Sequence, residues 1–478
     1  MKPSVTTASD DPARARDAHN AFAVFSFLWA GATLFHIASL YRWGDSIDEF
    51  LLGAAAVAVL ARPSSVRRLL VLATLQVYVV GLELPGVANH WLLAAFVNLT
   101  ILHAWVTLVV RGRSFVVTPG RLLRTFAPLA RIELLALYFF AVLHKLNSDY
   151  FDIDTGCGAV LYLYQADRFT FLPESAGFQT ASTYLTIGLE AAIPILLCTR
   201  RGRNLGIFLG LLFHTFLAFN PLSGFYNFSA MLFAMFFLFT SEDLASRSLE
   251  LLGTLRSRAR RIEWGRARRF SWRAALVGGG SVALGLTLLT LWRRAAYDDF
   301  LLPWAVYGFG LITLFVILVG RRVGNAHRGQ RLFELKYAQL LAVPVLVVVN
   351  GLNPYLGLKT ETSFGMFSNL RTEGNQSNHL FIPSSFQIFD FQKDLVEVMS
   401  SSRPQFQGYA DRRLVLPFYE FRAIASEDPA TEVSYIRNGE AHHVMRVGDD
   451  PELSHRPWTR KLLSFRAVSK ERRQKCRH

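Results

Sequence analysis

The chain has 478 residues, of which 51% are hydrophobic and 39 are phenylalanine. This apolar content indicates several membrane-crossing helices and excludes a small soluble cytosolic enzyme. The 51 lysines and arginines outnumber the 36 acidic residues, which gives a formal net charge of +15. In a chain with many apolar runs such a surplus reflects membrane topology before nucleic-acid affinity, so no nucleic-acid partner is expected. The three cysteines lie far apart, which argues against a metal site or a disulfide framework.

Apolar runs long enough to cross a bilayer predict about eleven helices. They lie near residues 20–41, 48–62, 65–82, 91–110, 126–146, 183–199, 204–219, 224–240, 274–292, 299–319 and 335–351. Residues 1–19 are predicted to be a disordered N-terminus. The predicted fold class is therefore mainly α, a polytopic transmembrane helical bundle over residues 20–351.

Basic residues concentrate in alternate loops between the predicted helices. These loops are 62–68, 111–124, 200–203, 241–273 and 321–331. The loops between them are acidic or neutral. Because short basic loops stay in the cytoplasm, this alternation predicts a multi-pass protein with a cytoplasmic N-terminus and an extracytosolic C-terminal region. The net positive charge then reflects topology.

Beyond residue 351 the long apolar runs give way to alternating apolar and polar residues, the pattern of half-buried strands. Such alternation occurs at 379–382, 386–391 and 414–421. Asn438-Gly439 between two further alternating runs predicts a tight hairpin turn. We therefore expect a small extracytosolic β-rich domain over residues 352–459. The basic residues of 460–478 predict a tail that is solvated or touches lipid headgroups.

Ionisable groups inside or at the end of an apolar helix are costly unless they are paired or functional, so each is a candidate site residue. Lys145 lies at the outer end of the helix predicted over 126–146, among aromatic and aliphatic neighbours. Desolvation there would favour the neutral amine, which can accept a proton as a general base. The alternative is structural: Lys145 would extend to the headgroups and pair with Asp149 one turn further on.

Further candidates lie on other predicted helices. The Asn89-His90 pair precedes the next helix on the same outer face, where an amide donor beside an imidazole would stabilise an oxyanion or enolate. A simpler role for the pair is to cap that helix. His214 would be either a functional group or a satisfied interior histidine. Glu133 and Glu190 are expected to pack or to form interhelical hydrogen bonds.

Taken together, these positions resemble the vitamin K-dependent γ-carboxylase family, whose membrane portion is called the HTTM domain. The resemblance covers residues 20–380. It rests on His144-Lys145-Leu146-Asn147-Ser148-Asp149-Tyr150, on Asn89-His90, on His214 with the segment running to Phe225-Tyr226-Asn227-Phe228, and on Asn353-Pro354-Tyr355 followed by Ser363-Phe364-Gly365-Met366-Phe367.

The resemblance implies an integral membrane lyase that is also a quinol epoxidase. Lys145 would deprotonate a reduced vitamin K or menaquinone-type quinol, and the quinol anion would add O₂ and collapse to a strongly basic alkoxide and finally an epoxide. The alkoxide would remove a proton from the γ-carbon of a peptide glutamate or another carbon acid, to which CO₂ then adds. Asn89 and His90 would hold the alkoxide or carbanion by hydrogen bonds, and no metal is required. The implied site also includes His214 and, more weakly, His144, Asn147, Asn220 and Tyr226.

The implied partners are the lipid bilayer, a lipid quinone that enters sideways and an extracytosolic peptide or protein substrate. His144 stands where the animal enzymes have a second basic residue. The region after residue 351 is shorter than their extracytosolic domain, so recognition of a propeptide is not implied. The alternative hypothesis is a non-catalytic membrane protein that binds a quinone or a lipid, or that acts as a scaffold.

Overall fold

The computed structural model describes residues 12–40, 46–222, 225–259, 300–320, 332–471 and 473–476. The chain divides into two compact units. Unit 1 comprises Met1–Leu75, Thr100–Arg131 and Ile193–Ala338, and unit 2 comprises Gln76–Leu99, Ile132–Ala192 and Gln339–His478. Four of the five boundaries fall inside α3 (Val66–Glu83), α4 (Asn89–Gly112), α5 (Pro119–Lys145) and α7 (Ala176–Cys198), and the fifth lies at residues 338–339.

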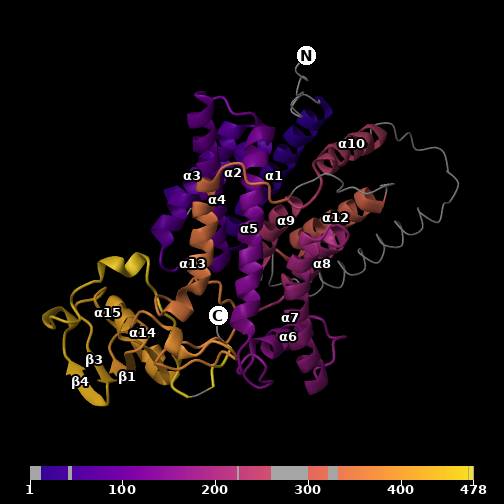
Figure 1. The fold of residues 1–478 in the computed structure, drawn as a ribbon. Helices are drawn as coiled ribbons and strands as arrows, with labels where there is room; N and C mark the ends of the chain where they lie inside the picture. Colours follow the sequence, from indigo (N-terminus) through magenta and orange to yellow (C-terminus); the bar gives the residue numbers. More distant parts are fainter. Residues whose placement is uncertain are drawn as a thin grey trace. The chain divides into compact units, whose positions relative to one another are not determined.

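Most of the described chain is helical (Figure 1). Unit 1 also contains α1 (Pro12–Ser39), α2 (Ile47–Ala61), α8 (Arg203–Leu217), α9 (Tyr226–Phe237), α10 (Glu242–Ala259) and α12 (Leu301–Gly320). Unit 2 also contains α6 (Cys157–Arg168) and α13 (Ala342–Leu356), which follows the 3₁₀ turn η1 (Ala338–Leu341). Each predicted helical segment overlaps one of these elements, except 274–292, which lies outside the described residues. Neither α6 nor the charged α10 was predicted, because neither has the long apolar run of a span.

Six helices in the described part of the chain are long and apolar enough to cross a membrane: α1, α4, α5, α7, α12 and η1 with α13. A seventh span results if α9 and the first part of α10, bent by 111° at their junction, are counted as one. Both α2 and α8 have 15 residues, which is too short for about 30 Å of hydrocarbon. These helices indicate a multi-pass membrane protein, but the predicted number of about eleven spans is not confirmed.

The first two helices begin at residues whose chemistry favours a helix start. Ser46 precedes α2 and its hydroxyl accepts a hydrogen bond from the backbone N of Glu49 at 3.2 Å, which is the capping-box pattern. Helix α1 begins at Pro12, where the missing N–H of proline costs nothing. Disorder had been predicted through residue 19, so that prediction was wrong for 12–19, while residues 1–11 lie outside the described residues.

Unit 2 ends in a small domain built on a five-stranded antiparallel sheet in the order β4-β3-β1-β2-β5. Its strands are β1 (Leu395–Ser401), β2 (Leu414–Pro417), β3 (Val433–Arg437), β4 (Glu440–Val444) and β5 (Val468–Ser469). Helices α14 (Pro404–Asp411) and α15 (Phe418–Ala425) add Phe406 and Phe421 to a core shared with Val396 of β1 and Tyr435 of β3. The predicted β-sheet domain is therefore present, with two short helices that were not predicted.

The predicted hairpin is confirmed. Strands β3 and β4 pair as far as Arg437 and Glu440. Asn438 and Gly439 between them have φ angles of 53° and 83°. Positive φ at both central residues is the backbone conformation that suits asparagine and glycine and that matches the twist of a tight hairpin.

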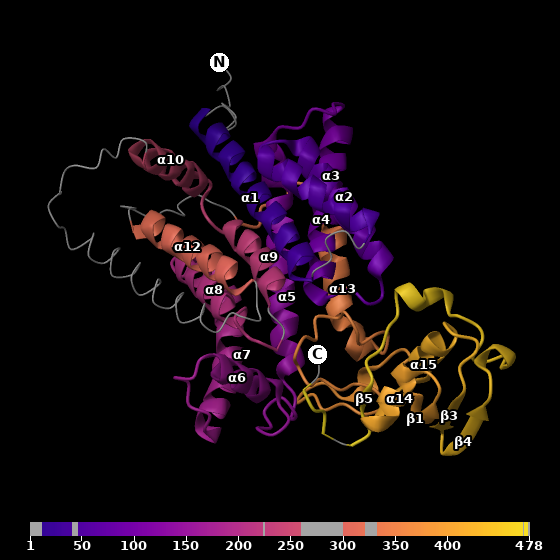
Figure 2. The ribbon, with the colours of Figure 1, turned by 180° about the vertical axis from the view of Figure 1, so that it is seen from behind.

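Two other predictions for this region were wrong. Among the alternating runs only 414–417 is a strand, because 418–425 forms α15 and 380–391 contains no strand. Pro383 interrupts that last run and has no N–H for a sheet ladder. The tail is not solvated throughout, since Gln474 is buried and strand β5, which is labelled in Figure 2, pairs with β2.

Candidate functional site

Lys145 is the last residue of α5 and forms a buried ion pair with Glu190 of α7. Its Nζ lies 2.6 Å from each carboxylate oxygen, and the two side chains are only 7% and 12% exposed. The alternative pairing with Asp149 does not form, because the helix ends at Lys145 and the chain turns away. Glu190 thus forms the expected interhelical contact, but its partner was missed. The pairing could have been predicted from the sequence, because the two residues carry opposite charges on consecutive predicted apolar helices.

This ion pair has both a structural and a chemical consequence. Removing one partner of a buried pair leaves an uncompensated charge and costs about 3–5 kcal/mol. The arrangement also places an amine and a carboxylate in direct contact at the carboxyl end of an apolar helix, with both side chains largely withdrawn from solvent.

His144, the residue before Lys145 in α5, lies in an aromatic cluster. It is fully buried, and its Nε2 donates to the carbonyl oxygen of Gly351 on α13 at 3.1 Å. Its ring contacts the rings of Phe140 and Tyr355. A Cβ on Gly351 would lie 2.2 Å from the Phe140 ring, so only glycine permits this close helix contact. The rings are tilted by 41° and 54° to one another and form a buried aromatic contact between α5 and α13, beginning at the residue before Lys145.

Asn147 fixes the turn that follows Lys145. Its Nδ2 donates to the carbonyl oxygens of His144 and Ser368 at 2.8 and 2.6 Å, and its Oδ1 accepts from the backbone N of Tyr150 at 2.9 Å. The side chain is completely buried. These contacts use both donors and an acceptor of the amide, so Asn147 positions the backbone rather than offering groups to a ligand.

Asn89 is the first residue of α4, and its contact differs from the expected cap. Its Oδ1 accepts from the backbone N of Phe364 at 2.6 Å. The partner belongs to the chain after α13, so the amide joins two segments of unit 2 instead of satisfying its own helix. His90 next to it is buried. The predicted oxyanion role of this pair stays a prediction.

Both asparagines contact one unusual stretch, residues 362–369, which we call the central segment. It contains non-glycine residues with left-handed backbone angles at Thr362 (54°), Phe364 (64°), Phe367 (48°) and Asn369 (54°). This conformation costs roughly 1–2 kcal/mol for each ordinary residue, and most for β-branched Thr362. Backbone outliers of this kind persist only where surrounding contacts hold them, and they cluster at functional sites.

The far end of the central segment joins a disulfide. Asn369 Oδ1 accepts from the backbone N of Cys157 at 2.8 Å, and its Nδ2 donates to the carbonyl oxygen of Gln474 at 2.7 Å. Cys157 is bonded to Cys476, so the expectation of unpaired, widely separated cysteines was wrong. The two residues are 319 positions apart, so nothing in the sequence indicated that they pair. The remaining cysteine, Cys198, is free.

Asp149 also forms a hydrogen bond with the segment that carries Cys476. Its Oδ2 accepts from Asn378 Nδ2 at 2.8 Å and from the backbone N of Gln474 at 2.9 Å. The motif carboxylate therefore holds the segment that carries Cys476 against the turn after α5.

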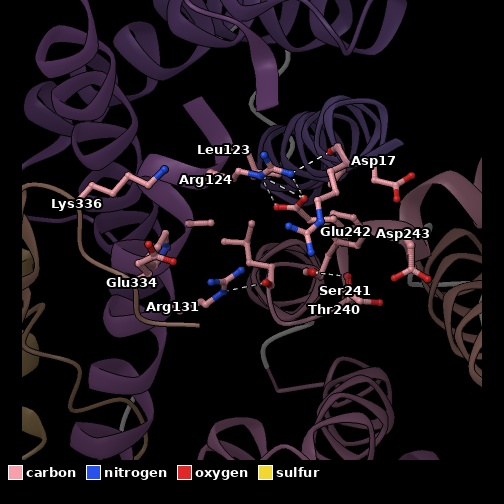
Figure 3. Close-up of a pocket in the computed structure, with 16 residues that line it drawn as sticks. Asp17, Leu123, Arg124, Arg131, Thr240, Ser241, Glu242, Asp243, Glu334 and Lys336 are labelled. Carbon is pink, nitrogen blue, oxygen red and sulfur yellow. Dashed lines mark hydrogen bonds and ion pairs between the residues drawn. The ribbon is translucent and has the colours of Figure 1, made fainter. Parts of the chain in front are cut away.

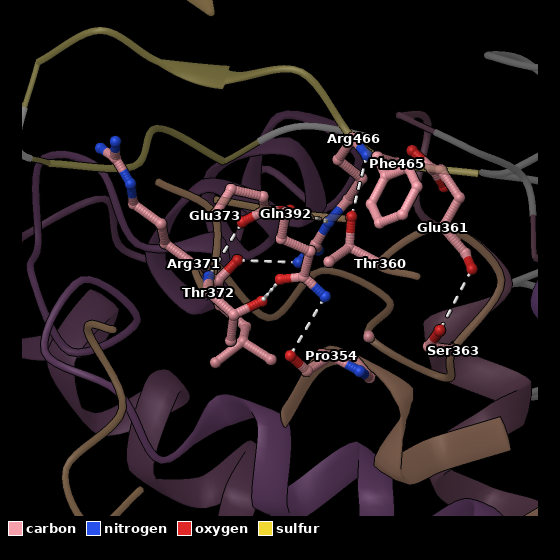
Figure 4. A network of polar contacts seen from close by, with 12 residues as sticks. Pro354, Thr360, Glu361, Ser363, Arg371, Thr372, Glu373, Gln392, Phe465 and Arg466 are labelled. Atoms are coloured by element: carbon pink, nitrogen blue, oxygen red, sulfur yellow. Dashed lines mark hydrogen bonds and ion pairs between the residues drawn. The ribbon is translucent and has the colours of Figure 1, made fainter. Parts of the chain in front are cut away.

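A buried polar network connects the end of α13 with the sheet domain (Figure 4). Gln392 Nε2 donates to the carbonyl oxygen of Pro354 at 3.2 Å, and Gln392 Oε1 accepts from Thr372 Oγ1 at 2.7 Å. Glu373 is completely buried, with one oxygen 4.0 Å from Arg466 Nε. Because buried polar groups need partners, the network specifies one position of the chain after α13 relative to the sheet.

Lys359 is a second buried lysine, which was not predicted as a site residue. Its Nζ donates to Thr362 Oγ1 at 3.1 Å, at the start of the central segment. Burial lowers the pKa of Lys359 to about 8, although the nearby Glu361 carboxylate opposes this shift. Its position directly after an apolar helix was the available signal. Lys359 is therefore a competing candidate for a neutral amine.

His379 fastens the chain beyond the central segment to α5. Its Nδ1 accepts from the backbone N of Phe381 and Ile382 at 3.1 and 3.0 Å, and its Nε2 donates to the carbonyl oxygen of Leu143 at 2.9 Å. Two donors at Nδ1 require the neutral Nε2–H tautomer. Burial lowers the pKa of His379 below its ordinary value of 6.5, while the bond to Leu143 opposes this shift.

The remaining predicted site residues belong to unit 1. His214 on α8 is buried against the rings of Phe228 and Phe236. Asn220 Oδ1 accepts from the backbone N of Leu222 at 3.0 Å, which shapes the turn after α8. Tyr226 begins α9 and its ring contacts Trp304. Lys145, His144, Asn147, Asn89 and His90 all belong to unit 2, so a single pocket that includes the unit 1 residues stays a prediction.

Unit 1 contains a separate cavity of about 390 Å³ between α1, α5, the junction of α9 with α10, and residues near 334 (Figure 3). Buried Arg131 at its wall donates to the carbonyl oxygens of Leu238 and Leu332 at 2.8 and 2.6 Å, and Arg124 pairs with Glu242 at 2.6 Å. The charged lining residues are Arg14, Arg124, Arg131, Lys336, Asp17, Glu242, Asp243 and Glu334. This balance favours no ion of one sign, and none of the predicted site residues lines the cavity.

Comparison with protein-family models, with curated proteins and with solved structures found no match for this chain. The likeness to γ-carboxylases therefore rests on the sequence motifs. What the geometry adds is that four positions, Asn89, Asn147, Asp149 and Cys157, are held in one hydrogen-bonded frame.

Replacing Cys157 and Cys476 together by serine is expected to lower the free energy of unfolding by about 2–4 kcal/mol, because the bond closes a very long loop. The measurement is the thermal midpoint of the purified protein in detergent or lipid. Cys198→Ser is the matched control and should leave the midpoint unchanged. Equal midpoints for the wild type, the double variant and the control would show that the bond does not stabilise the fold.

Acid is expected to weaken the His379 contacts. Because the pKa of His379 is lowered in the folded chain, its stabilising effect is fully present above pH 6.5 and is lost as the pH falls below that value. Protonation at Nδ1 would break two hydrogen bonds, worth about 1 kcal/mol each. Thermal midpoints of wild type and His379→Gln between about pH 8 and pH 5 measure this, since glutamine keeps a donor and an acceptor but cannot titrate there. Identical pH profiles for the two proteins would contradict the assignment.

Proposed function

We propose that this chain is a membrane enzyme resembling the vitamin K-dependent γ-carboxylases, which uses a reduced quinol and O₂ to act on a peptide glutamate or another carbon acid. The observation that carries the proposal is the buried pair of Lys145 and Glu190 at the end of an apolar helix. A surface ion pair would offer no comparable base, because water and salt would screen it. Here both side chains are largely shielded from water, so bulk solvent would compete little with the pair for a proton.

The residues present suit a quinol. The rings of Phe140, His144, Tyr355 and His379 follow one another in contact in unit 2. The apolar character of this aromatic group suits a naphthoquinone and the exclusion of water. When bound, a reduced quinol with O₂ would supply the strong base that the carbon acid requires.

The part taken by the chain is proton transfer and positioning. Lys145 would accept the quinol hydroxyl proton at Nζ once its own proton had passed to a Glu190 oxygen, so the pair would hold one additional proton. Asn147 fixes the backbone turn that presents Lys145. His90 next to Asn89 would donate a hydrogen bond to developing negative charge.

The proposed orientation places the sheet domain and the end of α5 outside the cytoplasm. The alternation of basic and neutral loops supports it. The bond between Cys157 and Cys476 supports it independently, because disulfides form and persist in oxidising compartments. Both cysteines would then lie on the outer side, with Lys145.

A non-catalytic role is the second candidate, and the same ion pair favours it, because Glu190 already satisfies the charge of Lys145. In that case the two residues would only join α5 to α7. The two candidates predict different results when the whole pair is removed. Replacing a buried pair by uncharged groups is often neutral for stability, whereas a catalytic amine cannot be replaced.

Lys145→Ala is expected to lower epoxide formation from a reduced menaquinone by about 10²–10⁴-fold, the usual contribution of a general base. The measurement uses purified protein in lipid, with no peptide added. Lys359→Ala is the matched control, since it removes the other buried lysine of unit 2, and should retain the activity.

The double variant Lys145→Met with Glu190→Gln separates folding from catalysis. It is expected to recover the thermal stability that Lys145→Ala loses, but to remain inactive. Epoxide formation by this folded double variant would exclude Lys145 as the base. If the well-folded wild type forms no epoxide from several quinols, the non-catalytic role is favoured. If Lys359→Ala loses the activity and Lys145→Ala retains it, Lys359 is the base.

A further inference from the structure

Unit 2 exposes a dense group of apolar side chains in residues 380–391, which we call the apolar loop. The exposed residues are Leu380 (53%), Phe381 (72%), Phe386 (65%), Ile388 (73%), Phe389 (41%) and Phe391 (38%). Asp390 is the one ionisable residue of the loop, and it pairs with Lys393. Isolated exposed apolar residues are common on proteins, but such a concentration marks a surface that binds something.

The apolar loop is fixed to the ends of two candidate spans. The backbone N of Leu380 donates to the carbonyl oxygen of Leu146, directly after α5, at 2.9 Å. The backbone N atoms of Ile388 and Phe389 donate to the carbonyl oxygen of Leu356, the last residue of α13, at 3.2 and 3.0 Å. The loop is therefore held at both sides at the level where these helices end.

Gly357 makes the contact with α13 possible. It follows the last residue of the helix, with a φ angle of 82°, and a Cβ at this position would lie 2.1 Å from the carbonyl oxygen of Phe389. Any other residue would be strained and would push the loop away from the helix end. Glycine at position 357 therefore allows the apolar loop to lie directly against the end of α13.

The exposed side chains of α13 indicate where the apolar loop lies relative to the bilayer. The helix exposes Val345, Leu346, Val348 and Val349, which form one stripe at helical spacing. From Val349 to Leu356 the helix rises about 10 Å, at 1.5 Å for each residue. A lipid-facing stripe that ends about 10 Å before the loop places the loop near the boundary between acyl chains and headgroups, where amphipathic segments bind.

We propose that the apolar loop inserts into the outer leaflet of the bilayer and docks the sheet domain on the membrane surface. Its occupant is lipid because the loop is bonded to the end of the helix that carries the apolar stripe, about 10 Å beyond that stripe, and presents aromatic and aliphatic groups with no unpaired charge. Insertion also sets the depth of the turn that carries Lys145, because Leu380 is bonded to Leu146. The proposal depends on membrane insertion of α5 and α13 and not on quinol chemistry.

The test measures the depth of spin labels attached to the full-length protein in lipid nanodiscs. In a Cys198→Ser background, which removes the free thiol, the variants Phe381→Cys and Ile388→Cys each receive one nitroxide. Met445→Cys, which lies beyond β4 and is 65% exposed against 72% and 73% for Phe381 and Ile388, is the matched control. We expect the labels at 381 and 388 to be at least about 3-fold more accessible to oxygen relative to a water-soluble nickel complex than the label at 445, as at the membrane boundary.

Labels at 381 and 388 that are as accessible to the nickel complex as the label at 445 would overturn the proposal. The discs contain only lipid and this protein, so that result would leave the apolar loop as a surface for another protein. If Phe381→Cys does not fold, Phe386→Cys reports on the same loop. Quinol epoxidation measured on the same discs shows separately whether the proposed enzymatic function holds, since the labels report depth even in an inactive protein.

Discussion

Polar groups that are withdrawn from water must find partners within the chain, and in unit 2 this requirement centres on residues 362–369. The central segment has four non-glycine residues in a costly backbone conformation. Asn89 and Asn147 hold its backbone, and Asn369 holds Cys157 and Gln474. The strained backbone and the amides therefore depend on each other, since neither would keep its place without the other.

The same constraint explains how the motif at the end of α5 divides its contacts. Asn147 and Asp149 use their hydrogen-bonding capacity on the backbone and on Asn378, whereas Lys145 pairs with a carboxylate. Glu190 neutralises Lys145 from a different helix, α7. Structure and chemistry are thus divided between neighbouring residues of one short motif, and a substitution at either kind of position would affect the site through a different route.

Hydropathy predicted the positions of the described spans, because burial in lipid leaves long apolar runs in the sequence. The Asn438-Gly439 turn was also predictable, since few residues adopt its backbone angles. Contacts between distant residues were not. The pairs Lys145 with Glu190 and Cys157 with Cys476 join segments whose separation is set by tertiary packing. The apolar run at 380–391 was taken for a strand because exposure to lipid and burial in a sheet leave similar patterns.

The contacts that hold the central segment determine which of its side chains can be substituted. Asn89 binds the backbone N of Phe364 and Asn147 binds the backbone oxygen of Ser368, so both amides recognise main-chain atoms. The half-buried side chains of Met366 and Phe367 lie between these two anchors. Because both anchors are main-chain contacts, the side chains at these two positions can be exchanged without removing either hydrogen bond.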